Sequence, residues 1–333
     1  MKRAVAIVAV LALTLVVAVA FSLFEPYRGF HGETFVRFDR GTGTLDMGRT
    51  LAQAGVIRYP WQFWIERLKQ PNARLQAGEY RFRAVATVGE VFGRIARGDV
   101  YFFEFTVPEG SNMFDIAHAL EAAGAMRADE FLRVAEDPAP VRDLAPSAKS
   151  LEGYLFPSTY RLSHSTTAPE LCRLMTDQFR KQWKKLAAGH LNVQETVTLA
   201  SLVEKETGVP SERPLVAGVF TNRLTKGMRL ECDPTTIYAA LLENRYRNAI
   251  HKSDLASQNP YNTYQHAGLP PGPIANPGAD AIEAALHPAE TEYLYFVAKP
   301  GGGGHQFSTS LAAHAKATQS YRKDVRKKPR KAS

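Results

Sequence analysis

The N-terminal apolar run constrains this chain more than any other feature. Residues Ala4–Phe24 are 21 consecutive uncharged residues, mostly Ala, Val and Leu. As a helix they would span about 30 Å, the thickness of a bilayer's hydrocarbon core. Lys2 and Arg3 precede the run, so the positive-inside rule places the N-terminus in the cytoplasm and the body in the periplasm. Residues 1–25 are therefore predicted to form a cytoplasmic stub and a single-pass anchor in the inner membrane.

A cleaved signal peptide is the alternative for this segment. Ala18-Val19-Ala20 fits the small-residue cleavage pattern. The apolar run is longer than the roughly 7–15 residues of a signal-peptide core, and it continues through Phe24. This length favours the uncleaved anchor, and both interpretations export the body.

The positive charge lies at the two ends of the chain. The net charge is +8, and segment 322–333 carries seven Lys or Arg residues against one Asp. Together with Lys2 and Arg3, this segment accounts for the whole excess, so residues 4–321 are balanced. A basic nucleic-acid-binding face is therefore not indicated, and 322–333 is predicted to be a disordered basic tail.

An internal repeat with an offset of 69 residues follows the anchor and a short linker that begins at Pro26. Segments 40–55 and 109–124 align Gly41 with Gly110, and Gly55 with Gly124. Each copy reads as a short strand, a Gly turn and a helix that ends at a Gly suited to a left-handed C-terminal position. The repeat indicates an α+β recognition module over residues 35–135, or a plain structural domain of the same class.

The two cysteines and nine histidines do not predict a metal site. Cys172 and Cys232 are 60 residues apart, with no CxxC spacing. In an oxidising compartment they could pair, and the alternative is two isolated buried thiols. The histidines show no HxxxH-type pair. No metal or cofactor is predicted.

A polar stretch with three prolines, 137–149, reads as a domain boundary. From Ser150 onward, dense motifs of Gly, Pro, Tyr and Asn suggest a site built on loops over a rigid scaffold. The second domain is expected over 150–321. Within it, Asp233 is predicted to cap a helix whose first residue is Pro234.

One helix carries the best candidate for chemistry. The segment from Gln194 to Gly208 has Leu199, Leu202 and Val203 on one face, and Glu206 falls close to Leu199 on that face. Glu204 is expected on the opposite, polar side. Burial near a helix C-terminus raises the pKa of a carboxyl group, as a general acid requires. The alternative for Glu206 is a structural partner for a buried Arg or a loop.

Several strings, taken together and in order, resemble the endolytic murein transglycosylase (YceG-like) family over nearly the whole chain. They are Glu152-Gly153-Tyr154-Leu155-Phe156-Pro157, Ala200-Ser201-Leu202-Val203-Glu204-Lys205-Glu206-Thr207, Ser211-Glu212-Arg213, Val219–Leu224, Asp233-Pro234-Thr235, Tyr261-Asn262-Thr263-Tyr264, Gly268–Ile274 and His287-Pro288-Ala289. The sequence departs from the family pattern at Pro214 and at Cys232, where a small polar residue is usual.

The resemblance implies an α+β fold with an N-terminal transmembrane helix, a LysM-like α+β subdomain and a C-terminal α+β transglycosylase domain. It implies a lyase that cuts the β-1,4 bond between N-acetylmuramic acid and N-acetylglucosamine, leaving 1,6-anhydro ends and limiting strand length near the peptidoglycan synthases. Glu206 matches the family's catalytic glutamate. The residues expected to shape the glycan groove are Glu152, Asn222, Asp233, Tyr261, Asn262 and Tyr264.

Two other functions remain open at this point. One is a hydrolytic muramidase that pairs Glu206 with Glu152 or Asp233 as the second carboxylate. The other is a non-enzymatic, membrane-tethered scaffold that binds the cell wall.

Overall fold

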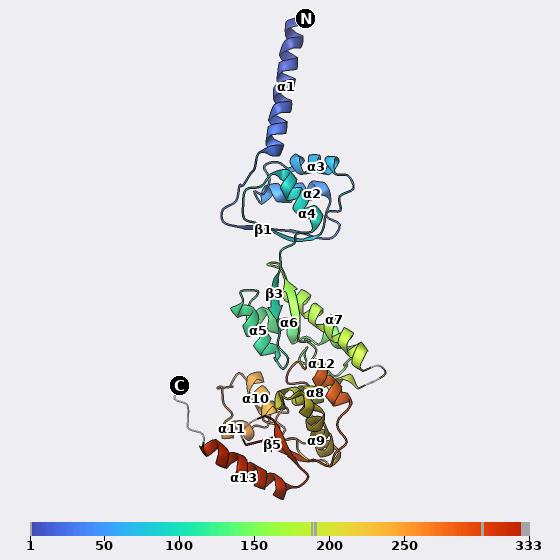
Figure 1. Ribbon diagram of the computed structural model, residues 1–333, viewed down its shortest axis with the longest axis vertical. Coiled ribbons are helices and arrows are strands. Elements are labelled where there is room, and N and C mark those ends of the chain that lie inside the picture. Colours follow the sequence, from blue (N-terminus) through green and yellow to red (C-terminus); the bar gives the residue numbers. More distant parts are fainter. Residues whose placement is uncertain (1, 188, 190–191, 301–302, 328–333) are drawn as a thin grey trace. The chain divides into compact units, whose positions relative to one another are not determined.

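The computed structural model describes residues 2–187, 189, 192–300 and 303–327. These residues divide into two compact units (Figure 1). Unit 1 comprises 1–104 and 161–166, and unit 2 comprises 105–160 and 167–333. The boundary falls within two strands that pair with each other, β3 (Phe103–Thr106) and β4 (Thr159–Leu162). Each unit mixes helices with short strands, so the expected α+β class is confirmed.

Helix α1 (Lys2–Phe24) contains the predicted anchor (Figure 1). Its stretch Ala6–Phe24 is long and apolar enough to cross a membrane. The C-terminal end of α1 is fixed to the body of unit 1, because Gln62 Nε2 donates to the Ser22 carbonyl at 2.7 Å and Arg58 pairs with Glu25 at 3.2 Å. Helix α1 therefore leads directly into the folded body of unit 1.

Unit 1 is built on one antiparallel strand pair covered by helices. Strands β1 and β2 pair with Thr34 opposite Phe82 and Phe38 opposite Gly78. The core includes fully buried Phe63 and Phe92, each worth about 2 kcal/mol of burial. The elements after α1 are β1 (Thr34–Phe38), α2 (Thr44–Gln53), α3 (Pro60–Lys69), β2 (Gly78–Phe82) and α4 (Val88–Arg97).

The sequence repeat is confirmed, and it extends further than the sequence suggested. Helices α2 and α5 (Met113–Ala122) begin and end 69 residues apart, and the glycines after them adopt left-handed conformations, at φ 69° for Gly55 and 66° for Gly124. Strand β3, α5, α6 (Ala128–Ala135), β4 and α7 (Ala168–Leu186) repeat the order of β1 to α4. Capping boxes at Thr87 and Thr167 begin the last helix of each copy.

This second copy crosses the boundary expected at 137–149. The segment holds only a short 3₁₀ turn, η1 (Ala139–Val141), and residues 105–135 belong to unit 2 rather than to the first domain. The sequence signal marks a loop between α6 and β4, because prolines and polar residues interrupt secondary structure without separating folding units.

The rest of unit 2 packs helices around α8. Strands β5 and β6 form an antiparallel pair with Tyr295 opposite Ser308. The remaining elements are α8 (Val193–Glu206), η2 (Pro210–Glu212), α9 (Arg213–Thr225), α10 (Asp233–Leu242), α11 (Lys252–Leu255), α12 (Ala279–Leu286), β5 (Tyr295–Ala298), β6 (His305–Ser308) and α13 (Leu311–Lys327).

Two terminal segments differ from expectation. The linker after Pro26 is part of unit 1, since Tyr27 and Ala86 exchange backbone hydrogen bonds and Gly29 N–H donates to the Gly55 carbonyl at 2.8 Å. Helix α13 continues through Lys327, so the first six residues of the predicted tail are helical. Residues 328–333 lie outside the described part of the chain.

Candidate active site

Glu206 is the last residue of α8 and lies half-buried at a cavity of about 260 Å³ in unit 2. Helices α9 and α13, strand β5 and the segment before α10 form its walls. The lining residues are Glu206, Phe220, Arg223, Leu230, Glu231, Cys232, Asp233, Tyr264, Phe296 and His314. Of the predicted site residues, the structure brings Glu206, Asp233 and Tyr264 together here.

Cys232 is a direct side-chain partner of the Glu206 carboxyl. The Cys232 thiol donates to Glu206 Oε1 with Sγ and Oε1 3.0 Å apart. Burial and the neighbouring carboxylate raise the pKa of Cys232 well above its usual value, so the thiol is neutral and available as a donor. The departure from the family pattern at position 232 therefore supplies a hydrogen bond to the candidate catalytic group.

The pKa of Glu206 is raised. Burial is the main cause, and the negative charge of Asp233 raises it further. The hydrogen bond from Cys232 and the electrostatic interactions with His305 and Arg223 lower the pKa of Glu206 without cancelling this effect. The C-terminal end of α8 adds a partial negative charge of the same sign as Asp233. A carboxyl in these surroundings keeps its proton to higher pH and can act as an acid.

Cys232 is itself held by buried threonines. Its backbone N–H donates to Thr263 Oγ1 at 3.0 Å, and its carbonyl accepts from Thr235 Oγ1 at 2.6 Å. The two hydroxyl oxygens lie 2.9 Å apart. This small network fixes the start of α10 and so the thiol. The prediction that Asp233 caps this helix is wrong, because Cys232 occupies the N-cap position and Asp233 is the first residue of α10.

Asp233 and Tyr264 form the polar side of the cavity. The Tyr264 hydroxyl donates to Asp233 Oδ1 at 2.6 Å. Burial and this hydrogen bond raise the pKa of Tyr264, so it remains a donor throughout the neutral range. Asp233 is thus a fixed negative charge close to Glu206.

Arg223 was not predicted as a site residue from the sequence, and its side chain connects the walls of the cavity. Its Nε donates to the Leu294 carbonyl at 2.7 Å, and Nη1 donates to the Leu230 carbonyl at 2.9 Å. The guanidinium also lies over the Tyr295 ring, 5.1 Å from its centroid. Helix α9 therefore holds both β5 and the segment before α10.

The segment that Arg223 holds contains backbone strain beside the site. Glu231 adopts φ 51°, a left-handed conformation that is uncommon for a residue other than Gly. Its carboxylate lies 3.6 Å from Arg223, and its N–H donates to the Thr263 carbonyl. These contacts stabilise a conformation that turns the chain so that Glu231, Cys232 and Asp233 all reach the cavity.

Glu212 and His305 form a second pair that the sequence did not reveal. Glu212 accepts hydrogen bonds from the His305 backbone N–H and from Nδ1, both at 2.8 Å. These bonds outweigh burial and lower the pKa of Glu212. A Cβ on Gly304 would come within 2.2 Å of the Glu212 carboxylate, so only glycine permits this approach. The Ser-Glu-Arg string was the only signal for Glu212.

Glu204 does not face solvent, which corrects the prediction. Its side chain is 7% exposed, pairs with Arg213 at 3.1 Å and accepts from the Gly278 N–H at 3.0 Å. Helical spacing alone implies one buried side, whereas α8 packs against α9, α10 and α12. Glu204 is therefore the structural partner of a buried Arg. The sequence analysis considered this role for Glu206 instead.

Glu152 is not part of the cavity around Glu206. It is 2% exposed, and its carboxylate accepts from the Met113 N–H and from Asn276 Nδ2, both at 2.9 Å. Burial raises the pKa of Glu152 to about 8, although hydrogen bonds from Met113 and Tyr238 oppose the shift. The residue joins α5 to the loop before α12.

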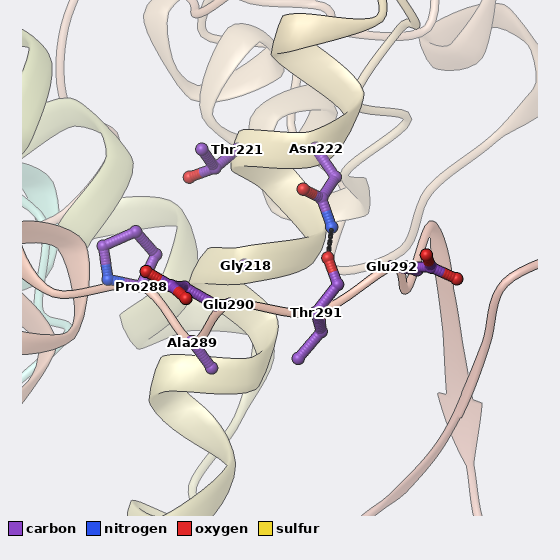
Figure 2. Close-up of a pocket in the computed structure, with 8 residues that line it drawn as sticks. All are labelled: Gly218, Thr221, Asn222, Pro288, Ala289, Glu290, Thr291 and Glu292. Atoms are coloured by element: carbon purple, nitrogen blue, oxygen red, sulfur yellow. Dashed lines mark hydrogen bonds between the residues drawn. The ribbon is translucent and has the colours of Figure 1, made fainter.

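Asn262 and Asn222 are also structural. Asn262 is fully buried, and its side-chain amide donates to the carbonyls of Asp254, Leu255 and Ser257. Asn222 Nδ2 donates to the carbonyls of Thr291 at 2.8 Å and Tyr293 at 2.9 Å. Figure 2 shows Asn222 pointing from α9 toward Thr291, at a separate cavity of about 470 Å³.

Tyr261 lines a further cavity of about 500 Å³ rather than the one at Glu206. Cys172 and Cys232 are both free and buried, which confirms the alternative of two isolated thiols.

Comparisons of this sequence with known proteins give consistent results. A sequence profile of the YceG-like family matches residues 36–320. The chain is 31% identical over 321 residues to the endolytic murein transglycosylase of Bacillus subtilis (strain 168), covering 90% of this chain and 88% of that protein. It is 28% identical to the endolytic murein transglycosylase of Streptococcus pneumoniae serotype 2, covering 84% of this chain but only 56% of that longer protein.

A solved structure is also similar. The crystal structure of a YceG-like protein from Listeria monocytogenes aligns with a TM-score of 0.55 and 29% sequence identity. The alignment covers 85% of this chain and 98% of that one.

Proposed function

Because the chain belongs to the YceG-like family, we propose that it is an endolytic murein transglycosylase with Glu206 as its catalytic acid and base. The observation that carries this proposal is the environment of Glu206. A single carboxyl with a raised pKa lies at a cavity, at the C-terminal end of α8, with a neutral thiol donating to one oxygen. The relatives that are named endolytic murein transglycosylases support the same function.

In the proposed first step, Glu206 gives its proton to the oxygen that links N-acetylmuramic acid to N-acetylglucosamine. The bond from C1 to that oxygen breaks, and positive charge develops at C1. Because Cys232 donates to Oε1, the proton to be transferred is placed on Oε2. Asp233 lies close enough for its negative charge to favour both the protonated acid and the developing cation.

In the second step, the Glu206 carboxylate removes the proton from the C6 hydroxyl of the same muramic acid. The C6 oxygen bonds to C1 and closes a 1,6-anhydro ring, which restores the protonated acid. Water takes no part, so one carboxyl suffices, unlike the two-carboxylate hydrolases. The reaction is a lyase reaction.

The hydrolytic alternative would need a second carboxylate to activate water. Glu152 is buried away from the cavity and engaged by Met113 and Asn276, so Asp233 remains the candidate. Digestion of purified glycan strands in H₂¹⁸O separates the two reactions. Transglycosylation gives 1,6-anhydro ends without ¹⁸O, whereas hydrolysis gives reducing ends that carry it.

We further propose that α1 anchors the enzyme in the inner membrane with its N-terminus in the cytoplasm, as Lys2 and Arg3 favour. The catalytic unit would then cut new strands close to the synthases and limit their length. Unit 1, with its two-stranded sheet and covering helices, would serve as the LysM-like glycan-binding module. A reporter enzyme that works only in the periplasm, fused after residue 333, tests the orientation.

A further inference from the structure

We propose that a second cavity in unit 2, formed by α5, α6, α10 and Tyr261, is an accessory subsite that binds the peptidoglycan strand several sugars away from Glu206 and makes the enzyme favour long strands. This inference rests on the proposed function. The cavity measures about 500 Å³ and is called the aromatic pocket below.

The aromatic pocket is lined by three rings, of which Phe114 and Tyr261 are partly exposed and Tyr238 is buried between them. Phe114 and Tyr238 have their centroids 6.1 Å apart, and Tyr238 and Tyr261 have theirs 5.1 Å apart. Leu242 contributes further apolar surface and is 37% exposed. Rings with an apolar face and a polar edge suit pyranose sugars, whose C–H faces are apolar and whose hydroxyls point outward.

The rim of the aromatic pocket carries both signs of charge. Glu136 and Lys149 are exposed and line the cavity, and neither pairs with another side chain in the part of the chain that the structure describes. Arg133 lies beside them. A peptidoglycan strand carries short peptides with free carboxylates and amines, which are the partners that such a rim can bind. A purely apolar protein partner would leave these charges unpaired.

The same two segments line both cavities. Helix α10 begins with Asp233 at the Glu206 cavity and ends with Leu242 at the aromatic pocket. Those two positions are nine residues apart, or about 13 Å along a helix. Segment 261–264 contributes Tyr264 to the first cavity and Tyr261 to the second. Helix α10 and segment 261–264 therefore connect the Glu206 cavity with the aromatic pocket.

The aromatic pocket also gives the second copy of the sequence repeat a function. Helix α5 supplies Phe114, and α6 supplies Leu132 and Arg133. This copy belongs to the same unit as Glu206, whereas the first copy lies in unit 1. The copy inside the catalytic unit would thus hold the strand while it is cut.

The test fills the pocket without touching Glu206. Leu242→Trp adds bulk at an exposed pocket residue, and Leu174→Trp adds the same bulk on α7, where Leu174 is 43% exposed and outside the pocket. Full-length wild type and both variants, in detergent, are assayed on long glycan strands with stem peptides and on the shortest strands that the wild type cleaves. A second variant, Lys149→Glu, tests the rim.

We expect Leu242→Trp to lower the preference for long strands, measured as the ratio of kcat/KM values, about tenfold through a higher KM. We expect Lys149→Glu to act in the same direction, and Leu174→Trp to match the wild type. If Leu242→Trp and Lys149→Glu both keep the wild-type preference for long strands, the aromatic pocket is not a subsite, although the protein is still a transglycosylase. If the wild type cleaves no strand at all, the proposed function itself fails.

Discussion

The Cys232 thiol lies 3.0 Å from Oε1 of Glu206 and donates to it, which joins the start of α10 to the end of α8. Two buried threonines hold Cys232, so the thiol is as fixed as the backbone around it. A side chain that departs from the family pattern therefore orients the proposed acid. This contact also makes the protonation of Glu206 sensitive to residue 232.

Cys232→Ala is expected to lower kcat about tenfold, because Glu206 loses the donor that orients it. The donor stabilises the ionised carboxyl, so its loss raises the pKa of Glu206 further. The alkaline limb of the pH–activity profile should therefore move to higher pH. Cys232→Ser retains a donor and should lie closer to the wild type in both respects. Profiles of kcat/KM for the three proteins provide the measurement, and coincident profiles would contradict the proposed contact.

Asp233→Asn is expected to move the alkaline limb of the pH–activity profile to lower pH. The negative charge of Asp233 raises the pKa of Glu206, and a neutral amide at this position removes that effect. Glu206 should then lose its proton at lower pH, and activity should decline earlier as the pH rises. Tyr264→Phe is the companion variant, because it removes the 2.6 Å hydrogen bond but leaves the charge of Asp233. An unshifted profile for Asp233→Asn would show that the two carboxyls do not interact.

Glu152 should make stability depend on pH. Its pKa is raised to about 8 by burial, so the folded protein holds a proton that the unfolded chain releases near pH 4.5. Stability from this residue is therefore present below pH 4.5 and is lost as the pH rises to about 8. Glu152→Gln should flatten that decline. Chemical unfolding between pH 5 and pH 9 provides the test, and parallel curves for wild type and variant would refute it.

Arg213→Met is expected to destabilise unit 2 by about 3–5 kcal/mol, because it leaves the buried Glu204 carboxylate without its partner. Adding Glu204→Gln should recover part of the loss. Arg49→Met breaks an exposed pair with Asp46 in unit 1 and serves as the control, with little expected change. Urea unfolding of the four proteins measures the effect. Equal losses in the single and double variants would mean that Glu204 does not depend on Arg213.

The sequence predicted the features that depend on local patterns. The offset of 69 residues located α2 and α5, and the glycines after them adopt the expected left-handed conformation. Helical spacing and the family resemblance both selected Glu206. The residues that determine each of these helices and turns lie within about 20 residues of one another, where helix and turn geometry determine which side chains meet.

The sequence could not predict features that depend on packing between distant segments. Helix α8 is covered on several sides, so helical spacing placed Glu204 wrongly. Asn222 and Asn262 looked like sugar ligands, but they satisfy backbone carbonyls of irregular segments, a need that the residue type alone does not reveal. Arg223 and the Glu212–His305 pair act on segments about 70 to 90 residues away.

The assignment of Glu206 is tested most directly by Glu206→Gln beside Glu195→Gln, an identical change at an exposed position in the first turn of the same helix. Turnover of purified glycan strands is measured by mass spectrometry of 1,6-anhydro products, with thermal unfolding as a check of folding. We expect Glu206→Gln to fold like the wild type and to lose at least about a thousandfold in kcat, whereas Glu195→Gln should retain full activity. A folded Glu206→Gln enzyme that still releases 1,6-anhydro products at the wild-type rate would contradict this assignment.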